Sequence, residues 1–138
     1  MWRCFFLLSL LFTLPSYGQD KQKAPESPIP VISGDLGSCT ADFTVTGTRL
    51  KPLYNAKLAV ELRYGFAGLH RTTLEIYTNV DGKARFTGLP ETNKRPLAFT
   101  ASYKGRKTVV IVDVEQNCHG AYNAIVTDEP VKTDEAAE

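Results

Sequence analysis

Hydrophobic and polar residues alternate over most of the chain between residues 39 and 126. Because successive side chains of a β-strand point to opposite faces, a period of two predicts strands that bury one face. We expect strands at residues 39–45, 56–64, 69–78, 83–87, 96–103, 107–115 and 120–126. The spacing of apolar residues in this segment does not favour a helix, so the pattern predicts an all-β domain.

The side chains expected to face a shared interior are distributed over these strands. They are Cys39, Ala41, Phe43, Val45, Leu58, Val60, Leu62, Leu74, Ile76, Ala84, Phe86, Leu97, Phe99, Ala101, Tyr103, Tyr122, Ala124 and Val126. The unbroken apolar run from Val109 to Val112 predicts a strand buried on both faces or central to its sheet. Asp81-Gly82 is a dipeptide that favours tight hairpins, and we expect one there. About seven short strands with frequent turn signals predict a two-sheet antiparallel β-sandwich of the Ig-like or prealbumin-like kind.

Residues 1–18 have the organisation of a cleaved signal peptide. One basic residue, Arg3, is followed by an apolar run over residues 5–14, and small residues precede a cut ahead of Gln19. A membrane anchor is the alternative, but a run of about ten residues is roughly half of what a bilayer core requires. We therefore expect an exported protein, secreted or periplasmic, without a stable membrane span after processing.

Two further segments differ in composition from the predicted sandwich at residues 39–127. Residues 19–38 are rich in proline, serine and glycine and contain few large apolar groups, which predicts a flexible Pro-rich linker. Residues 128–138 are acidic, and we expect a disordered, solvated tail.

The cysteines favour a disulfide. Cys4 precedes the apolar run of the signal peptide and is expected to be removed with it. Cys39 and Cys118 then form an even pair in a chain bound for an oxidising compartment, where a disulfide is the default. Two buried thiols or a redox pair are the alternatives, but the wide spacing does not match the Cys-x-x-Cys motif.

The charge and the motifs of the sequence do not indicate a nucleic-acid partner, a metal or a cofactor. Without Arg3, 15 of the 16 basic residues remain and balance the 15 acidic ones, so nucleic acid is not an expected partner. His70 and His119 lack a second ligand at a metal-like spacing, and no Gly-x-Ser-x-Gly motif is present. The sequence therefore predicts no metal, no cofactor and no catalytic residues.

Three segments resemble a known family. The segments are residues 39–46 (CTADFTVT), 51–60 (KPLYNAKLAV) and 78–90 (TNVDGKARFTGLP). They are similar to the carboxypeptidase regulatory-like domains of the transthyretin-like, or prealbumin-like, group of β-sandwiches. The resemblance covers about residues 39–126. It implies the sandwich fold and a role as an accessory module beside an enzyme, adhesin or transporter, but its motif residues are folding residues and do not identify a function.

The segment with the composition of a contact surface is residues 64–71. Tyr64, Phe66 and Leu69 supply apolar area, and His70 and Arg71 supply polar groups, which is typical of binding hot spots. Two interpretations are open. These residues form a partner-binding loop, or the aromatic side chains fold back and cap one end of the sandwich, which is the interpretation we favour.

These observations lead to an expected function. We expect an exported, non-enzymatic binding or structural accessory module that contacts an extracytoplasmic protein or glycan through exposed loops or a sheet edge. The alternative is a transthyretin-like small-molecule carrier or hydrolase with a cleft at an oligomer interface. The sequence does not determine the oligomeric state.

Overall fold

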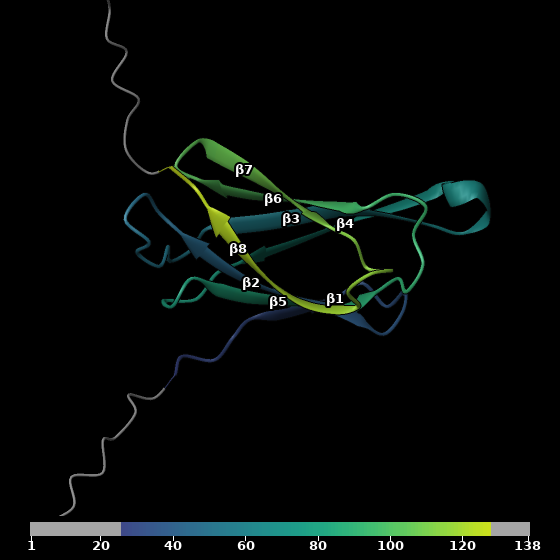
Figure 1. Ribbon diagram of the computed structural model, residues 1–138, viewed down its shortest axis with the longest axis horizontal. Coiled ribbons are helices and arrows are strands. Elements are labelled where there is room, and N and C mark those ends of the chain that lie inside the picture. Colours follow the sequence, from purple (N-terminus) through teal and green to yellow (C-terminus); the bar gives the residue numbers. More distant parts are fainter. Residues whose placement is uncertain (1–25, 128–138) are drawn as a thin grey trace, which may run out of the picture.

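The computed structural model describes residues 26–127, which form two stacked β-sheets (Figure 1). The predicted signal peptide, the first part of the linker and the acidic tail lie outside the described residues. Eight strands are present: β1 (Val31–Ser33), β2 (Cys39–Thr46), β3 (Lys57–Tyr64), β4 (His70–Tyr77), β5 (Lys83–Leu89), β6 (Leu97–Tyr103), β7 (Arg106–Val112) and β8 (His119–Ile125). A short 3-10 turn, η1 (Phe66–Gly68), lies between β3 and β4. The predicted β-sandwich is confirmed.

The two sheets have four strands each. The first has the order β1-β5-β2-β8 and the second the order β4-β3-β6-β7. β1 pairs with β5, and β8 with β2, in parallel, so the sandwich is not purely antiparallel as expected. The predicted hairpin at Asp81-Gly82 is also wrong, because β4 and β5 belong to different sheets and this turn carries the chain from one layer to the other. Gly82 is required there, since its φ is 71° and a Cβ would lie 2.4 Å from the carbonyl oxygen of Val45.

The core consists of the inward faces of both sheets, and its centre is aromatic. The ring of Phe43 lies 4.7 Å from that of Phe99 in the opposite sheet and 5.7 Å from that of Phe86 beside it, and Phe86 and Phe99 are 4.9 Å apart. All three side chains are fully buried. Each ring contributes both apolar burial and an edge-on or tilted aromatic contact, so this trio fixes how the sheets pack.

Two expectations about strand placement are wrong. Within the segment predicted as a flexible linker, Val31–Ser33 form β1, because the edge of β5 offers free backbone groups for pairing. The run from Val109 to Val112 is not buried on both faces. It lies in β7 at the edge of its sheet, and the side chains of Val109 and Ile111 point to the uncovered outer face.

The predicted disulfide between Cys39 and Cys118 is present. It links the first residue of β2 to the residue before β8, and the backbone N–H of Thr40 donates a hydrogen bond to the Cys118 carbonyl at 2.7 Å. The bridge therefore fixes the start of the parallel β2–β8 pair, which no short turn connects. A disulfide is compatible with an oxidising compartment outside the cytoplasm. In residues 26–127, no helix has the length and apolarity needed to cross a membrane.

Tyr122 of β8 fills the space beside a glycine. Its ring stacks on Phe43 at 5.5 Å, and a Cβ at Gly120 would lie 2.3 Å from the Tyr122 hydroxyl oxygen. Partial burial, and secondarily the negative charge of Asp113, raise the pKa of this phenol above its usual value.

Replacing both bridging cysteines by alanine should destabilise the domain by about 4 kcal/mol in the chain-entropy model, because the bond closes a long loop in the unfolded chain. Urea unfolding of the oxidised protein and of the C39A/C118A variant measures the difference. Equal unfolding midpoints would contradict a structural role for the bridge.

The raised pKa of Tyr122 predicts a stability loss in alkali. The folded state holds the phenolic proton more tightly than the unfolded chain, so this contribution is complete below the unfolded tyrosine pKa of about 10 and is lost as pH rises through the higher folded value. Unfolding free energies measured between about pH 9 and 11.5 should fall more steeply for the wild type than for Tyr122→Phe. The Tyr54→Phe variant, which removes an exposed phenol, serves as control, and an equal change of slope in both variants would contradict the assignment to Tyr122.

Candidate functional site

One row of side chains crosses all four strands of the β4-β3-β6-β7 sheet on its outer face. Lys57 of β3 lies opposite Tyr77 of β4 and opposite Ser102 of β6, and Ser102 lies opposite Lys107 of β7. Side chains at paired positions of neighbouring strands share a face, so the four form a continuous floor. The register of three strand pairs, rather than any sequence motif, brings them together.

Together with residues of adjacent turns, this floor lines a cleft of about 640 Å³. Tyr54 and Asn55 come from the turn before β3, and Tyr103, Lys104 and Gly105 come from the β6–β7 hairpin. We call these nine residues the tyrosine–lysine cleft. Its lining therefore combines three phenol rings with three ammonium groups.

The charge of the cleft is positive. Lys57 Nζ lies 3.7 Å from Glu75 Oε1, so one of the three lysines has an acidic partner. Lys104 Nζ lies 5.3 Å from the centre of the Tyr103 ring, a cation–π contact that holds the lysine against the hairpin. The side chains of Tyr54 and Tyr77 are 63% and 51% exposed, so their ring faces are accessible to a ligand.

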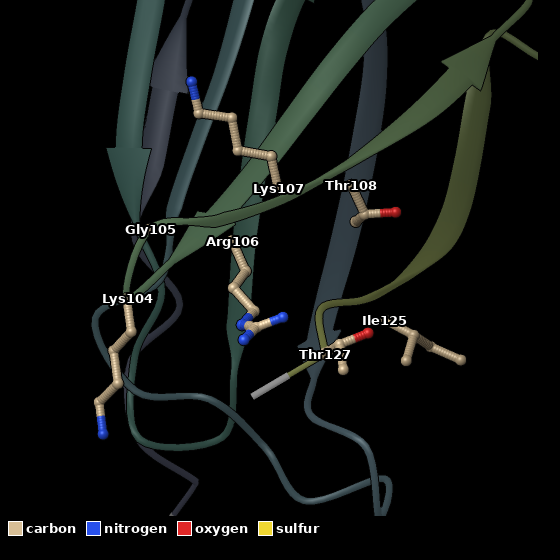
Figure 2. A pocket seen from close by; sticks show the side chains of 7 residues that line it. All are labelled: Lys104, Gly105, Arg106, Lys107, Thr108, Ile125 and Thr127. Carbon is tan, nitrogen blue, oxygen red and sulfur yellow. The ribbon is translucent and has the colours of Figure 1, made fainter. Parts of the chain in front are cut away.

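A second hollow of about 480 Å³ lies on the other side of the β6–β7 hairpin (Figure 2). Arg106 and Thr108 face Ile125 and Thr127 across it, whereas Lys104 and Lys107 point away from the hairpin in opposite directions. Lys104, Gly105 and Lys107 line both hollows. The hairpin therefore supplies positive charge to both sides, while the aromatic rings lie only on the tyrosine–lysine cleft.

The described residues contain no cluster of the four side-chain types that most often bind metal ions. Within residues 26–127, no group of three or more histidine, cysteine, aspartate or glutamate side chains is close enough together to hold one. His70 stacks on Tyr64 at 5.3 Å in one sheet, and His119 Nδ1 lies 3.0 Å from the Thr40 hydroxyl in the other. The tyrosine–lysine cleft presents rings, hydroxyls and ammonium groups, which can bind and orient a ligand.

The predicted contact loop lies apart from this cleft. Tyr64, Phe66, Leu69, His70 and Arg71 form the tip of the β3–β4 hairpin and line neither hollow. The interpretation that the aromatic side chains cap the sandwich is wrong, because Phe66 is 89% exposed and Leu69 75% exposed. The hairpin carries them away from the core.

Sequence reasoning missed the tyrosine–lysine cleft. Alternation placed Lys57 and Tyr77 on outward faces, but it does not show which outward residues of different strands lie side by side. The sequence signal was limited to the adjacent Tyr103-Lys104 pair before the turn glycine Gly105.

Comparisons with known proteins identify the fold. No family model and no curated protein matches the sequence. Among solved structures, the chain is similar to catechol 1,2-dioxygenase from Acinetobacter sp. ADP1, with a TM-score of 0.50 and 13% identity over 73% of this chain and 59% of that one. Catechol 1,2-dioxygenase from Pseudomonas arvilla C-1 gives a TM-score of 0.50 and 12% identity over 81% of this chain and 62% of that one. The chain thus spans about three fifths of the length of these enzymes.

This similarity corrects our functional expectation. We expected a non-enzymatic binding or structural accessory module, with a transthyretin-like carrier or hydrolase as the alternative. Both of these structures with a similar sandwich are enzymes, so the sandwich fold gives no support for a non-enzymatic role. The expectation was wrong because the absence of familiar catalytic motifs from one sequence says little about function, which depends on how distant residues are brought together.

The exposure of the hairpin tip can be tested by measuring the free energy of unfolding of two variants. Phe66→Ser should change the free energy of unfolding by less than about 0.5 kcal/mol, because the ring buries little surface. The matched core variant Phe86→Ala should lose about 3–5 kcal/mol. Urea unfolding measures both, and a loss for Phe66→Ser comparable to that for Phe86→Ala would restore the capping interpretation.

Proposed function

We propose that the chain is an exported protein, secreted or periplasmic, that binds a small anionic aromatic compound in the tyrosine–lysine cleft as the substrate site of an enzyme acting on such compounds. The observation that carries the proposal is the row Tyr77–Lys57–Ser102–Lys107, which places a phenol ring, two ammonium groups and a hydroxyl on one floor.

Each part of this ligand has a counterpart in the cleft. An aromatic ring gains offset or edge-on contacts with the exposed rings of Tyr54 and Tyr77. A carboxylate or phenolate gains charge-assisted hydrogen bonds from Lys57 and Lys107, the two ammonium groups on the floor of the cleft. The cleft volume of about 640 Å³ falls in the range of small-molecule sites.

The solved structures with a similar fold support an enzyme that acts on aromatic compounds. Catechol, the compound after which the similar enzymes are named, is an aromatic diol. Oxygenase chemistry draws on a metal or an organic cofactor. The role we assign to the cleft, from its lining of rings, hydroxyls and ammonium groups, is to bind, orient and neutralise the substrate.

Calorimetric titration with 3,4-dihydroxybenzoate, which has both a ring and a carboxylate, tests this proposal. The K57Q/K107Q variant should bind it about tenfold more weakly, since two exposed charge contacts contribute up to about 1 kcal/mol each. Tyr77→Leu should also weaken binding, because it removes a ring face. Lys94→Gln changes an exposed lysine outside the cleft and should bind like the wild type.

Two further ligands distinguish the contribution of the aromatic ring to the affinity from that of the negative charge. Catechol lacks the carboxylate and cyclohexanecarboxylate lacks the aromatic ring, so each should bind more weakly than 3,4-dihydroxybenzoate. Equal affinities of the wild type and K57Q/K107Q for 3,4-dihydroxybenzoate would remove the cleft as its site.

A further inference from the structure

The β3–β4 hairpin extends beyond the sheet to which it belongs. β3 pairs with β4 along its whole length, but it pairs with β6 only from Lys57 to Val60. The last four residues of β3 therefore pair with β4 alone, over roughly 13 Å at about 3.4 Å per residue. Leu62 is still buried, so the free part begins at Arg63. Figure 1 shows this hairpin projecting from one end of the sandwich, with η1 at its tip.

The tip holds two large apolar side chains in solvent. Phe66 is 89% exposed and Leu69 75% exposed, more than any other large hydrophobic side chain of residues 26–127. The turn is hydrogen-bonded, because the N–H of Gly68 donates to the Gly65 carbonyl and the N–H of Leu69 to the Phe66 carbonyl, each at 3.2 Å. Positive φ angles at Gly65, Ala67 and Gly68 fix its shape. An ordered turn that keeps such residues in water implies a partner for them.

The residues behind the tip are arranged in layers along the hairpin. The first pair is Tyr64 and His70, whose stacked rings combine an apolar body with a polar edge. The next pair is Arg63 and Arg71, both exposed, and both within 3.7 Å of a carboxylate oxygen of Glu61. From the tip inward, the order is therefore apolar, amphipathic and cationic, with two arginines to one glutamate.

We propose that the β3–β4 hairpin tip inserts into the surface of an anionic lipid membrane. The order of its layers matches the order of chemistry in a bilayer surface, in which hydrocarbon lies below an amphipathic interface and phosphate groups lie above it. Phe66 and Leu69 enter the acyl region, the Tyr64–His70 stack lies at the interface, and the arginines contact lipid phosphates. A protein surface would not require apolar and cationic groups at successive depths.

Insertion of the tip does not depend on the tyrosine–lysine cleft. The cleft and the tip share no residue, and Tyr77 lies at the opposite end of β4 from His70. Membrane attachment through the tip leaves the cleft facing solvent.

Tryptophan fluorescence at the tip tests the proposal. The chain has one tryptophan, Trp2, so the W2F/F66W variant carries a single reporter at the tip and W2F/I111W carries one at an exposed apolar position on β7. With vesicles of equimolar phosphatidylcholine and phosphatidylglycerol, the emission of the W2F/F66W variant should shift to the blue and be quenched by brominated acyl chains. The emission of the W2F/I111W variant should not change.

Other outcomes overturn the proposal. No shift for the reporter at position 66 would exclude insertion, and equal shifts at both positions would indicate adsorption without a specific contact. A shift at position 66 that grows with protein concentration in the absence of vesicles would assign the tip to a second copy of the chain.

The cationic layer has its own test. Adding R63Q/R71Q to the W2F/F66W background should weaken binding to the anionic vesicles about tenfold or more, and pure phosphatidylcholine vesicles should bind the parent variant correspondingly weakly. The role given to the arginines would be contradicted if R63Q/R71Q left the affinity for anionic vesicles unchanged and if pure phosphatidylcholine vesicles bound the parent variant equally well. Circular dichroism confirms that each variant keeps its β-sheet spectrum.

Discussion

The contact among Phe43, Phe86 and Phe99 is the interaction on which the rest of the structure depends. Two rings come from one sheet and the third from the other, and all are fully buried, so they join the layers at their centre. Once these inward side chains are fixed, every alternate residue of the same strands must point outward. The outer rows are therefore a consequence of the core, and a slip of one residue in any strand would disperse them.

The tyrosine–lysine cleft is one of these outer rows. The residues of this row come from three separate parts of the chain, namely Lys57, Tyr77 and the hairpin pair of Ser102 and Lys107. They meet because three strand pairings share one register. Turns at the same end of the sheet add rings and charge. The opposite end of β3 and β4 carries the projecting hairpin tip, so the two features with ligand-binding character lie at opposite ends of one strand pair. This separation allows a surface contact at one end and a small-molecule site at the other.

Local alternation was sufficient to predict the sandwich and most inward side chains, because a period of two reports directly which face is buried. The Cys39–Cys118 pair was predicted separately, from the even number of cysteines in a chain expected to be exported. It was not sufficient for features that depend on tertiary context. The apolar run in β7 looked central but lies at an edge, and Val31–Ser33 looked like linker but adds a strand to β5. The cleft could not be predicted because alternation does not report which strands are neighbours. The likeness to dioxygenases is visible only in three dimensions, at 12–13% identity.

The most direct test of the central claim, that the register of four strands builds a ligand site, is a two-dimensional ¹H–¹⁵N NMR titration of the protein with 3,4-dihydroxybenzoate. The account predicts shift changes that cluster at Lys57, Tyr77, Ser102 and Lys107 and in the adjoining turns, with no change at Phe66 or Leu69. Changes confined to the hairpin tip or to the β2–β8 edge, or no saturable change anywhere, would contradict it.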